Sequence, residues 1–198
     1  ASLGYFINPL INILLGWFFL RERMRPLQWI AVAVAFTGVS IELWVQRSVP
    51  WLGLTLALSF GFYGLLRKQV SVPAAIGLWV ETTLMLPIAL LFLLWLLSTE
   101  GLRPVTEVFQ LALGGVISVV PLVFFAAAAL RLPLTTLGFV QYLAPSCALL
   151  LAVFLYNEPV PQVRWVTFVF IWSALAIFTA ENVYDLRKRR RIAQARIL

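Results

Sequence analysis

The sequence contains one pattern of residues twice. The pattern consists of Pro9, Glu22 and Trp29 in one copy and of Pro145, Glu158 and Trp165, each 136 positions later, in the other. Both copies lie in long apolar stretches, and each follows a leucine, a glycine and an aromatic residue, at 3–5 and at 137–139. Self-similarity over so long a distance indicates two structural halves rather than a solenoid of short repeats.

The composition places these halves in a membrane. Hydrophobic residues make up 62% of the 198 residues, charged residues 12%, and the mean hydropathy is +0.96. So few polar residues cannot cover the surface of a water-soluble domain. A β-barrel would alternate apolar and polar residues, whereas these runs are apolar on all sides. We therefore predict an all-α polytopic membrane protein with seven transmembrane helices, at approximately 3–20, 27–46, 51–66, 76–97, 108–130, 134–156 and 162–181.

The basic residues predict the orientation, because Lys and Arg near helix ends stay on the cytoplasmic side. If the C-terminal tail is inside, twelve basic residues lie on the inner side and only Arg47, Arg103 and Arg164 on the outer side. We therefore expect the N-terminus outside and the C-terminus in the cytoplasm. The net charge of +7 then determines topology, and no nucleic-acid partner is expected because no folded module would bind it.

The two copies are unequal in length. The first holds two predicted helices, but three further helices precede the matching pair in the second, so a complete unit has five. We expect a ten-helix parent whose first three helices are missing here: residues 1–47 are the end of the first unit, 51–181 the second unit, and 182–198 a basic tail. Because five is odd, equivalent helices run in opposite directions. Such inverted repeats are common in secondary transporters, with a site near the bilayer midplane.

The repeated residues resemble a known family, the EamA repeat of the drug/metabolite transporter superfamily, whose members have ten helices in two units. Its proline, glutamate and glycine pattern is met by Pro9, Glu22 and Gly38, and less fully by Pro145, Glu158 and Ala174. Longer strings are similar to the RarD-type permeases, the chloramphenicol-sensitivity group: ASLGYFINPLINILLG, ALSFGFYGLLRK, ETTLMLP, TTLGFVQYLAP and TFVFIWSALAIF. This likeness covers nearly the whole chain and begins within the family's fourth helix. It implies a bacterial inner-membrane permease for small metabolites or drugs.

Polar side chains near the prolines are candidates for a substrate site, because a proline frees backbone groups that can face a cavity. Tyr5, Asn8 and Asn12 share one face of their predicted helix. The candidate substrate-binding residues are Tyr5, Asn8, Asn12, Tyr63, Glu81, Gln141, Tyr142 and Ser146, and the predicted helix breaks are Pro9, Pro87, Pro121 and Pro145. The alternative is that the polar groups hold helices together, at about 0.6 kcal/mol each, and that Tyr63 and its neighbouring glycines serve close helix packing.

Glu81 is the candidate for a proton or cation site. It lies about six residues inside its predicted helix, where an ionisable group costs up to about 3 kcal/mol unless it is paired or faces water. The alternative is a carboxylate that reaches the membrane surface and pairs with Arg67 or Lys68. Glu42 is expected at the membrane interface.

The composition also excludes most enzyme classes. The chain has no histidine, one aspartate (Asp185) and one cysteine (Cys147), so a Ser-His dyad, a histidine haem ligand, an aspartyl dyad and a cysteine metal cluster are excluded. We predict no catalytic activity and no cofactor. The function expected is alternating-access transport of a small molecule, with a non-transporting receptor or scaffold as the alternative. Glu22 and Glu158 are expected to fix turn geometry, and this chain alone is expected to be inactive.

Overall fold

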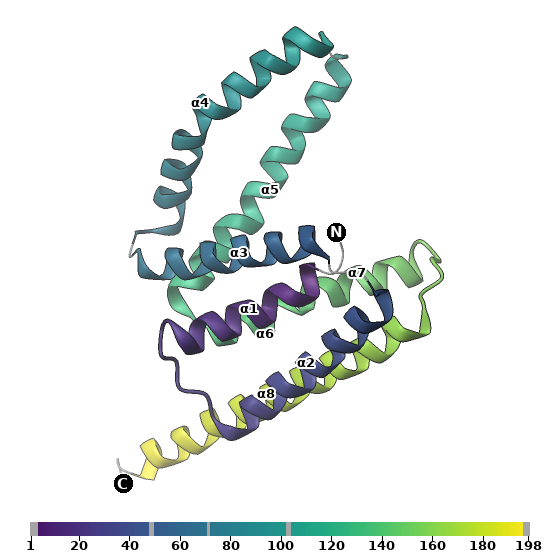
Figure 1. The fold of residues 1–198 in the computed structure, drawn as a ribbon. Helices are drawn as coiled ribbons and strands as arrows, with labels where there is room; N and C mark the ends of the chain where they lie inside the picture. The colour runs from purple at the N-terminus through teal and green to yellow at the C-terminus, as the bar shows by residue number, and fades with distance from the viewer. Residues whose placement is uncertain (1–3, 48–49, 71, 102–103, 196–198) are drawn as a thin grey trace. The chain divides into compact units, whose positions relative to one another are not determined.

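The structure is a computed structural model that describes residues 4–47, 50–70, 72–101 and 104–195. These residues form eight helices and no strand (Figure 1): α1 (Gly4–Phe18), α2 (Pro26–Gln46), α3 (Trp51–Gln69), α4 (Ala74–Glu100), α5 (Val105–Arg131), α6 (Leu134–Gln141), α7 (Leu143–Phe154) and α8 (Gln162–Ala195). Helices α6 and α7 meet at Tyr142 and together occupy one predicted span. The predicted seven helical segments are therefore confirmed.

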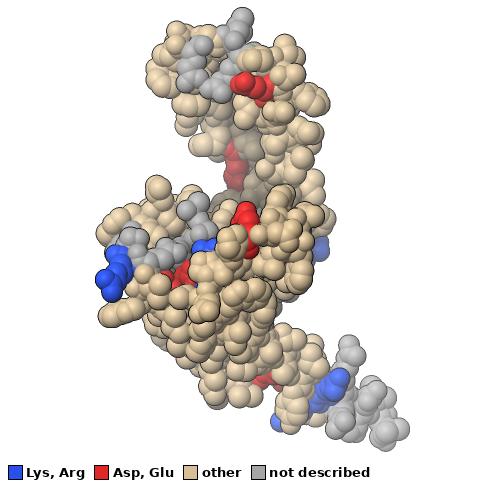
Figure 2. Space-filling model, turned by 90° about the vertical axis from the view of Figure 1, so that its right-hand side faces the viewer, with Lys and Arg blue, Asp and Glu red and all other residues tan. Residues whose placement is uncertain are grey.

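Within the described ranges, five segments are long and apolar enough to cross a bilayer: α2, α4, α5, α6 with α7, and α8. Helix α1 is a shorter apolar helix of 15 residues, and α3 has 19 residues and ends in Arg67 and Lys68. Charged side chains are sparse on the face shown in Figure 2. Most side chains of α4 and α5 are apolar and exposed, which suits contact with lipid. The all-α polytopic membrane fold is confirmed.

The helices differ from the expected ones at several points. Helix α8 continues through the basic segment to Ala195, because nothing between 182 and 195 breaks a helix. Helices α1, α4 and α5 run on through Pro9, Pro87 and Pro121, so these prolines do not interrupt them. Each proline removes one hydrogen-bond donor, and the remaining bonds carry the helix. Among the four, only Pro145 lies next to an interruption, at Tyr142.

The chain forms two compact units. The first contains α1, α2, most of α3, and α6 to α8, and the second contains the end of α3 with α4 and α5. Within the first unit α2 packs along α8, and α1 packs along α6 (Figure 1). Its core is built by apolar side chains from these helices, among them Phe6, Ile13, Phe139, Phe168 and Ile171.

The two repeated hairpins, α1–α2 and α6/α7–α8, run in opposite directions (Figure 1). In the α2 and α8 pair, the start of α2 meets the end of the apolar part of α8, where Arg25 pairs with Glu181. The end of α2 meets the start of α8, where Glu42 pairs with Arg164. Helices α1 and α6 are antiparallel as well, because the loop after α1 binds the first residues of α6. Each helix of one copy thus packs antiparallel to a helix of the other.

The turn that closes the first helix is also the same in both copies. Arg21 and Asn157 both adopt a left-handed backbone conformation, with φ of 52° and 49°, which few residues other than glycine do. The next residue then closes the turn by donating a backbone hydrogen bond, Glu22 to the carbonyl of Gly16 at 3.1 Å and Glu158 to that of Ala152 at 2.9 Å. Residues 136 positions apart therefore share their local structure, although of these three pairs only Glu22 and Glu158 are the same residue.

Candidate functional site

The glutamate of the first turn binds the start of α6. Pro133, which precedes α6, provides no side-chain cap for it. The Glu22 carboxylate does so, since Oε1 accepts a hydrogen bond from the Leu134 N–H at 2.6 Å and Oε2 one from the Thr135 N–H at 2.9 Å. A negative charge is favourable there because a helix N-terminus carries unpaired N–H groups and a partial positive charge. Glu22 therefore joins the two copies.

Helices α1 and α6 approach each other closely, and two predicted site residues meet between them. A Cβ added to Gly138 would lie 2.6 Å from the Pro9 carbonyl oxygen, so only glycine fits. Asn12 is 0% exposed, and its Nδ2 donates to Oε1 of Gln141 at 2.6 Å. The side-chain oxygens of Asn8 and Asn12 are buried and have no hydrogen-bond partner among residues 4–195 that the structure describes. Each of these two oxygens retains the capacity to accept a hydrogen bond.

Tyr142 and Ser146 are engaged in hydrogen bonds within the first unit. The Tyr142 hydroxyl donates to the carbonyl of Phe6 at 3.3 Å. The Ser146 hydroxyl donates to the carbonyl of Tyr142 at 2.8 Å and accepts from Nε1 of Trp172 at 3.0 Å. For these two residues the geometry favours a role in helix packing. The interruption at Tyr142 lies three residues before Pro145, which has no N–H to donate to the carbonyl of Gln141.

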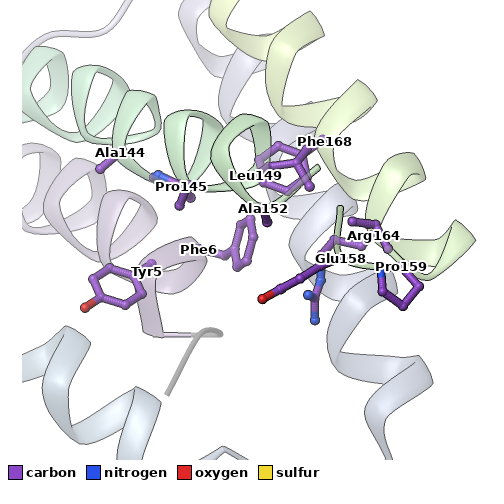
Figure 3. A pocket seen from close by; sticks show the side chains of 12 residues that line it. Tyr5, Phe6, Ala144, Pro145, Leu149, Ala152, Glu158, Pro159, Arg164 and Phe168 are labelled. Carbon is purple, nitrogen blue, oxygen red and sulfur yellow. The ribbon is translucent and has the colours of Figure 1, made fainter. Parts of the chain in front are cut away.

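A cavity of about 230 Å³ lies in the first unit. Figure 3 shows the side chains that line it, which include Tyr5 and Phe6 of α1, Pro145 and Leu149 of α7, and Glu158 and Arg164 from the following loop and the start of α8. Of the candidate substrate residues, only Tyr5 lines this cavity. Glu158 and Arg164 were not among the candidate substrate residues, because they come to line the same cavity as Tyr5 only through the packing of the two copies.

Arg164 connects the cavity to a buried carboxylate. Its Nε lies 3.6 Å from Oε1 of Glu42, and Oε2 of Glu42 accepts a hydrogen bond from the Thr167 hydroxyl at 3.1 Å. Glu42 is 5% exposed. Glu42 is therefore buried between α2 and α8, and its place at the membrane interface stays a prediction. Arg164 and Thr167 provide the charge and the hydrogen bond that a buried carboxylate needs.

A second charged cluster holds the opposite end of the same helix pair. The Arg25 guanidinium lies 2.8 Å from Glu181 and 2.5 Å from Asp185. The hydrogen bonds to Glu181 and then to Asp185 raise the pKa of the Arg25 guanidinium. An arginine near the start of each helix thus pairs with an acidic residue toward the end of the other.

Glu81 lies in the second unit. Nη1 of Arg67 is 3.4 Å from Oε1 of Glu81, whose side chain is 38% exposed. Nη2 of Arg67 donates to the carbonyls of Pro73 at 3.2 Å and Ala74 at 2.7 Å, which fastens the turn between α3 and α4. The alternative prediction that Glu81 pairs with Arg67 is confirmed.

Tyr63 lies on α3 and is half-buried, with its ring centroid 5.9 Å from that of Phe60. The neighbouring Gly61 faces Ile11 of α1, and a Cβ there would lie 2.6 Å from Cγ2 of Ile11. Close helix packing therefore accounts for Gly61. The role of Tyr63 as a substrate residue stays a prediction.

Comparison with known proteins gives relatives of nearly the whole chain. The chain is 51% identical over 187 residues to an uncharacterized transporter of Vibrio cholerae, covering 92% of this chain and 62% of the relative. It is 47% identical over 192 residues to protein RarD of Escherichia coli (95% and 65%) and 45% identical over 185 residues to an uncharacterized transporter of Bacillus subtilis (92% and 62%). No family model and no solved structure matches it. The chain is thus similar over most of its length to bacterial proteins named RarD or transporter, and it spans between 62 and 65% of the length of these three.

Proposed function

We propose that this chain is the larger part of an EamA-type, RarD-like permease that moves a small metabolite or drug across the bacterial inner membrane by alternating access. The names of the relatives support transport in general. The observation that carries the mechanism is the antiparallel packing of two equivalent hairpins, α1–α2 and α6/α7–α8. Inverted repeats of this kind allow one half to rock against the other around a fixed site.

The proposed site lies where α1 crosses α6 and α7. Asn8 and Asn12 offer buried acceptor oxygens there, and Gln141 holds Asn12. Tyr5 faces the cavity at one end of this crossing. At the other end Glu22 fastens the loop after α1 to the start of α6. Rocking about the crossing would open one of these ends while it closes the other.

Glu81 is the proposed proton-carrying group. Its carboxylate is partly exposed and pairs with Arg67, which also holds the turn after α3. Protonation of Glu81 would weaken this ion pair and loosen that turn, because the attraction depends on the carboxylate charge. In this scheme the N-terminus of the chain is outside and the C-terminus is cytoplasmic, as the basic residues favour.

The test is uptake of a radiolabelled metabolite and drug panel by vesicles that contain a full-length protein with this sequence. Asn12→Leu and Gln141→Leu should abolish uptake of the substrate found, and Glu81→Gln should remove its pH dependence. Glu107→Gln, a change at an exposed acidic residue in the first turn of α5, is the control. Unchanged pH dependence in Glu81→Gln would remove that residue from the mechanism. Absence of uptake for the whole panel would favour a receptor or scaffold. The 198-residue chain alone should not transport.

A further inference from the structure

The two equivalent glutamates have different surroundings. Both follow a left-handed residue, and both backbones close the same turn. The Glu22 carboxylate accepts hydrogen bonds from the first N–H groups of α6. The Glu158 carboxylate is exposed and lines the cavity in the first unit. Among the residues described, no hydrogen bond or ion pair engages the Glu158 carboxylate.

The charges around the cavity do not balance. Arg164 is the basic residue of the lining, and it is already paired with Glu42 at 3.6 Å. Glu42 keeps its own partners, since Thr167 donates to it as well. One positive charge therefore faces two negative charges, and the excess negative charge belongs to Glu158. This charge has no partner among the described residues and attracts a cation.

The other walls of the cavity are apolar and aromatic. Phe6 and Phe168 both line it, and their rings contact edge to face with centroids 5.3 Å apart. Tyr5 and Leu149 extend this lining. Figure 3 shows Tyr5 and Phe6 on α1, with Glu158 and Arg164 on the segment across from them. Aromatic faces attract cations through their quadrupole, and apolar walls favour a ligand with an apolar body.

We propose that this cavity binds a small organic cation with an apolar body, whose ammonium group pairs with Glu158 and whose body packs against Phe6 and Phe168. The inference rests on the proposed permease function, because it names the substrate class for the cavity beside Tyr5. It also gives Glu158 a role in binding, which its repeat equivalent Glu22 does not have.

The experiment is calorimetric titration of the purified full chain in detergent at neutral pH with three probes of similar size. Benzyltrimethylammonium is the cation, benzyl alcohol the neutral probe and phenylacetate the anion. The cation should bind most tightly, and Glu158→Gln should weaken its binding by about tenfold or more. Glu107→Gln should leave binding unchanged. Equal cation binding in Glu158→Gln and wild type, or tighter binding of phenylacetate than of the cation, would overturn the proposal.

A melting temperature measured on the same samples separates binding from folding. If Glu158 caps a helix as Glu22 does, Glu158→Gln will lower the melting temperature and leave cation binding unchanged, which also overturns the proposal. Vesicle uptake by the full-length protein tests the permease function separately. Uptake without Glu158-dependent cation binding contradicts only the cation site. Glu158-dependent binding without any uptake supports the cation site and contradicts the permease.

Discussion

Glu22 and Thr135 lie 113 residues apart in the sequence and form two hydrogen bonds. Oε2 of Glu22 accepts from the backbone N–H of Thr135 at 2.9 Å and from its hydroxyl at 2.8 Å. Gly16 leaves room for this carboxylate, since a Cβ there would lie 2.8 Å from Oε2. A single side chain therefore fastens the end of the first repeated helix to the start of its equivalent.

Loss of the Glu22 charge should destabilise the first unit. In Glu22→Gln the amide nitrogen replaces one acceptor, and the favourable interaction with the α6 N-terminus is lost. We expect the free energy of unfolding to fall by about 1 to 2 kcal/mol, seen as a lower melting temperature by circular dichroism in detergent. Glu158→Gln, at the equivalent position of the other copy, is the matched control and should leave the melting temperature unchanged. Equal melting temperatures for all three proteins would contradict the capping role.

The hydrogen bond between Asn12 and Gln141 can be measured by a double-mutant cycle. Asn12→Leu and Gln141→Leu each remove one partner of the 2.6 Å bond, and the double variant removes both. We expect a coupling energy of about 0.6 kcal/mol, the average for such bonds between membrane helices. The three variants and wild type are compared by unfolding in mixed micelles. Strictly additive effects would show that the two amides do not depend on each other.

Close approach of α1 and α6 predicts the effect of a methyl group at Gly138. Gly138→Ala places a Cβ 2.6 Å from the Pro9 carbonyl oxygen and 2.7 Å from Cγ1 of Ile13, so the helices must move apart. We expect a loss of about 1 to 3 kcal/mol in stability, the usual cost of overpacking. Gly114→Ala is the control, because among the described residues no atom outside the adjoining backbone of its own helix lies within 4 Å of its added Cβ. It should be neutral or slightly stabilising. A melting temperature for Gly138→Ala at or above that of wild type would be inconsistent with the observed packing.

The helices and their number could be predicted, because a helix needs an apolar run of about 20 residues to cross the hydrocarbon core of a bilayer. The copies could be recognised from Pro9 and Pro145, and the structure adds that their turns share a left-handed residue. The ends of the helices were predicted less accurately than their number. Helix α8 passes residue 181 and reaches Ala195, since a loss of hydropathy ends a membrane span but does not by itself end a helix.

Most interaction partners of individual side chains could not be predicted from the sequence. Arg67 could be proposed as the ion-pair partner of Glu81, because both residues lie near the short turn between α3 and α4. Burial of Glu42 could not be foreseen, because it depends on α2 lying antiparallel to α8 and on Arg164 and Thr167 meeting it there. The cap at the start of α6 depends equally on long-range packing. A carboxylate in a turn carries no sequence signal that names its distant partner.

The direction of the two hairpins can be tested by cross-linking. A Cβ added at Gly38 of α2 would lie 2.7 Å from the Cβ of Phe170 on α8, so Gly38→Cys with Phe170→Cys should form a disulfide after a small adjustment. Cys147 is replaced by alanine in this experiment so that the introduced pair is alone. The control is Gly38→Cys with Ala174→Cys. These two positions are equivalent in the repeat, and Ala174 lies one helical turn beyond Phe170 on α8. Oxidation of the purified chain should cross-link the first pair, detected as a mobility shift on a denaturing gel that reducing agent reverses. Preferential cross-linking of the second pair would contradict the antiparallel register on which the alternating-access proposal depends.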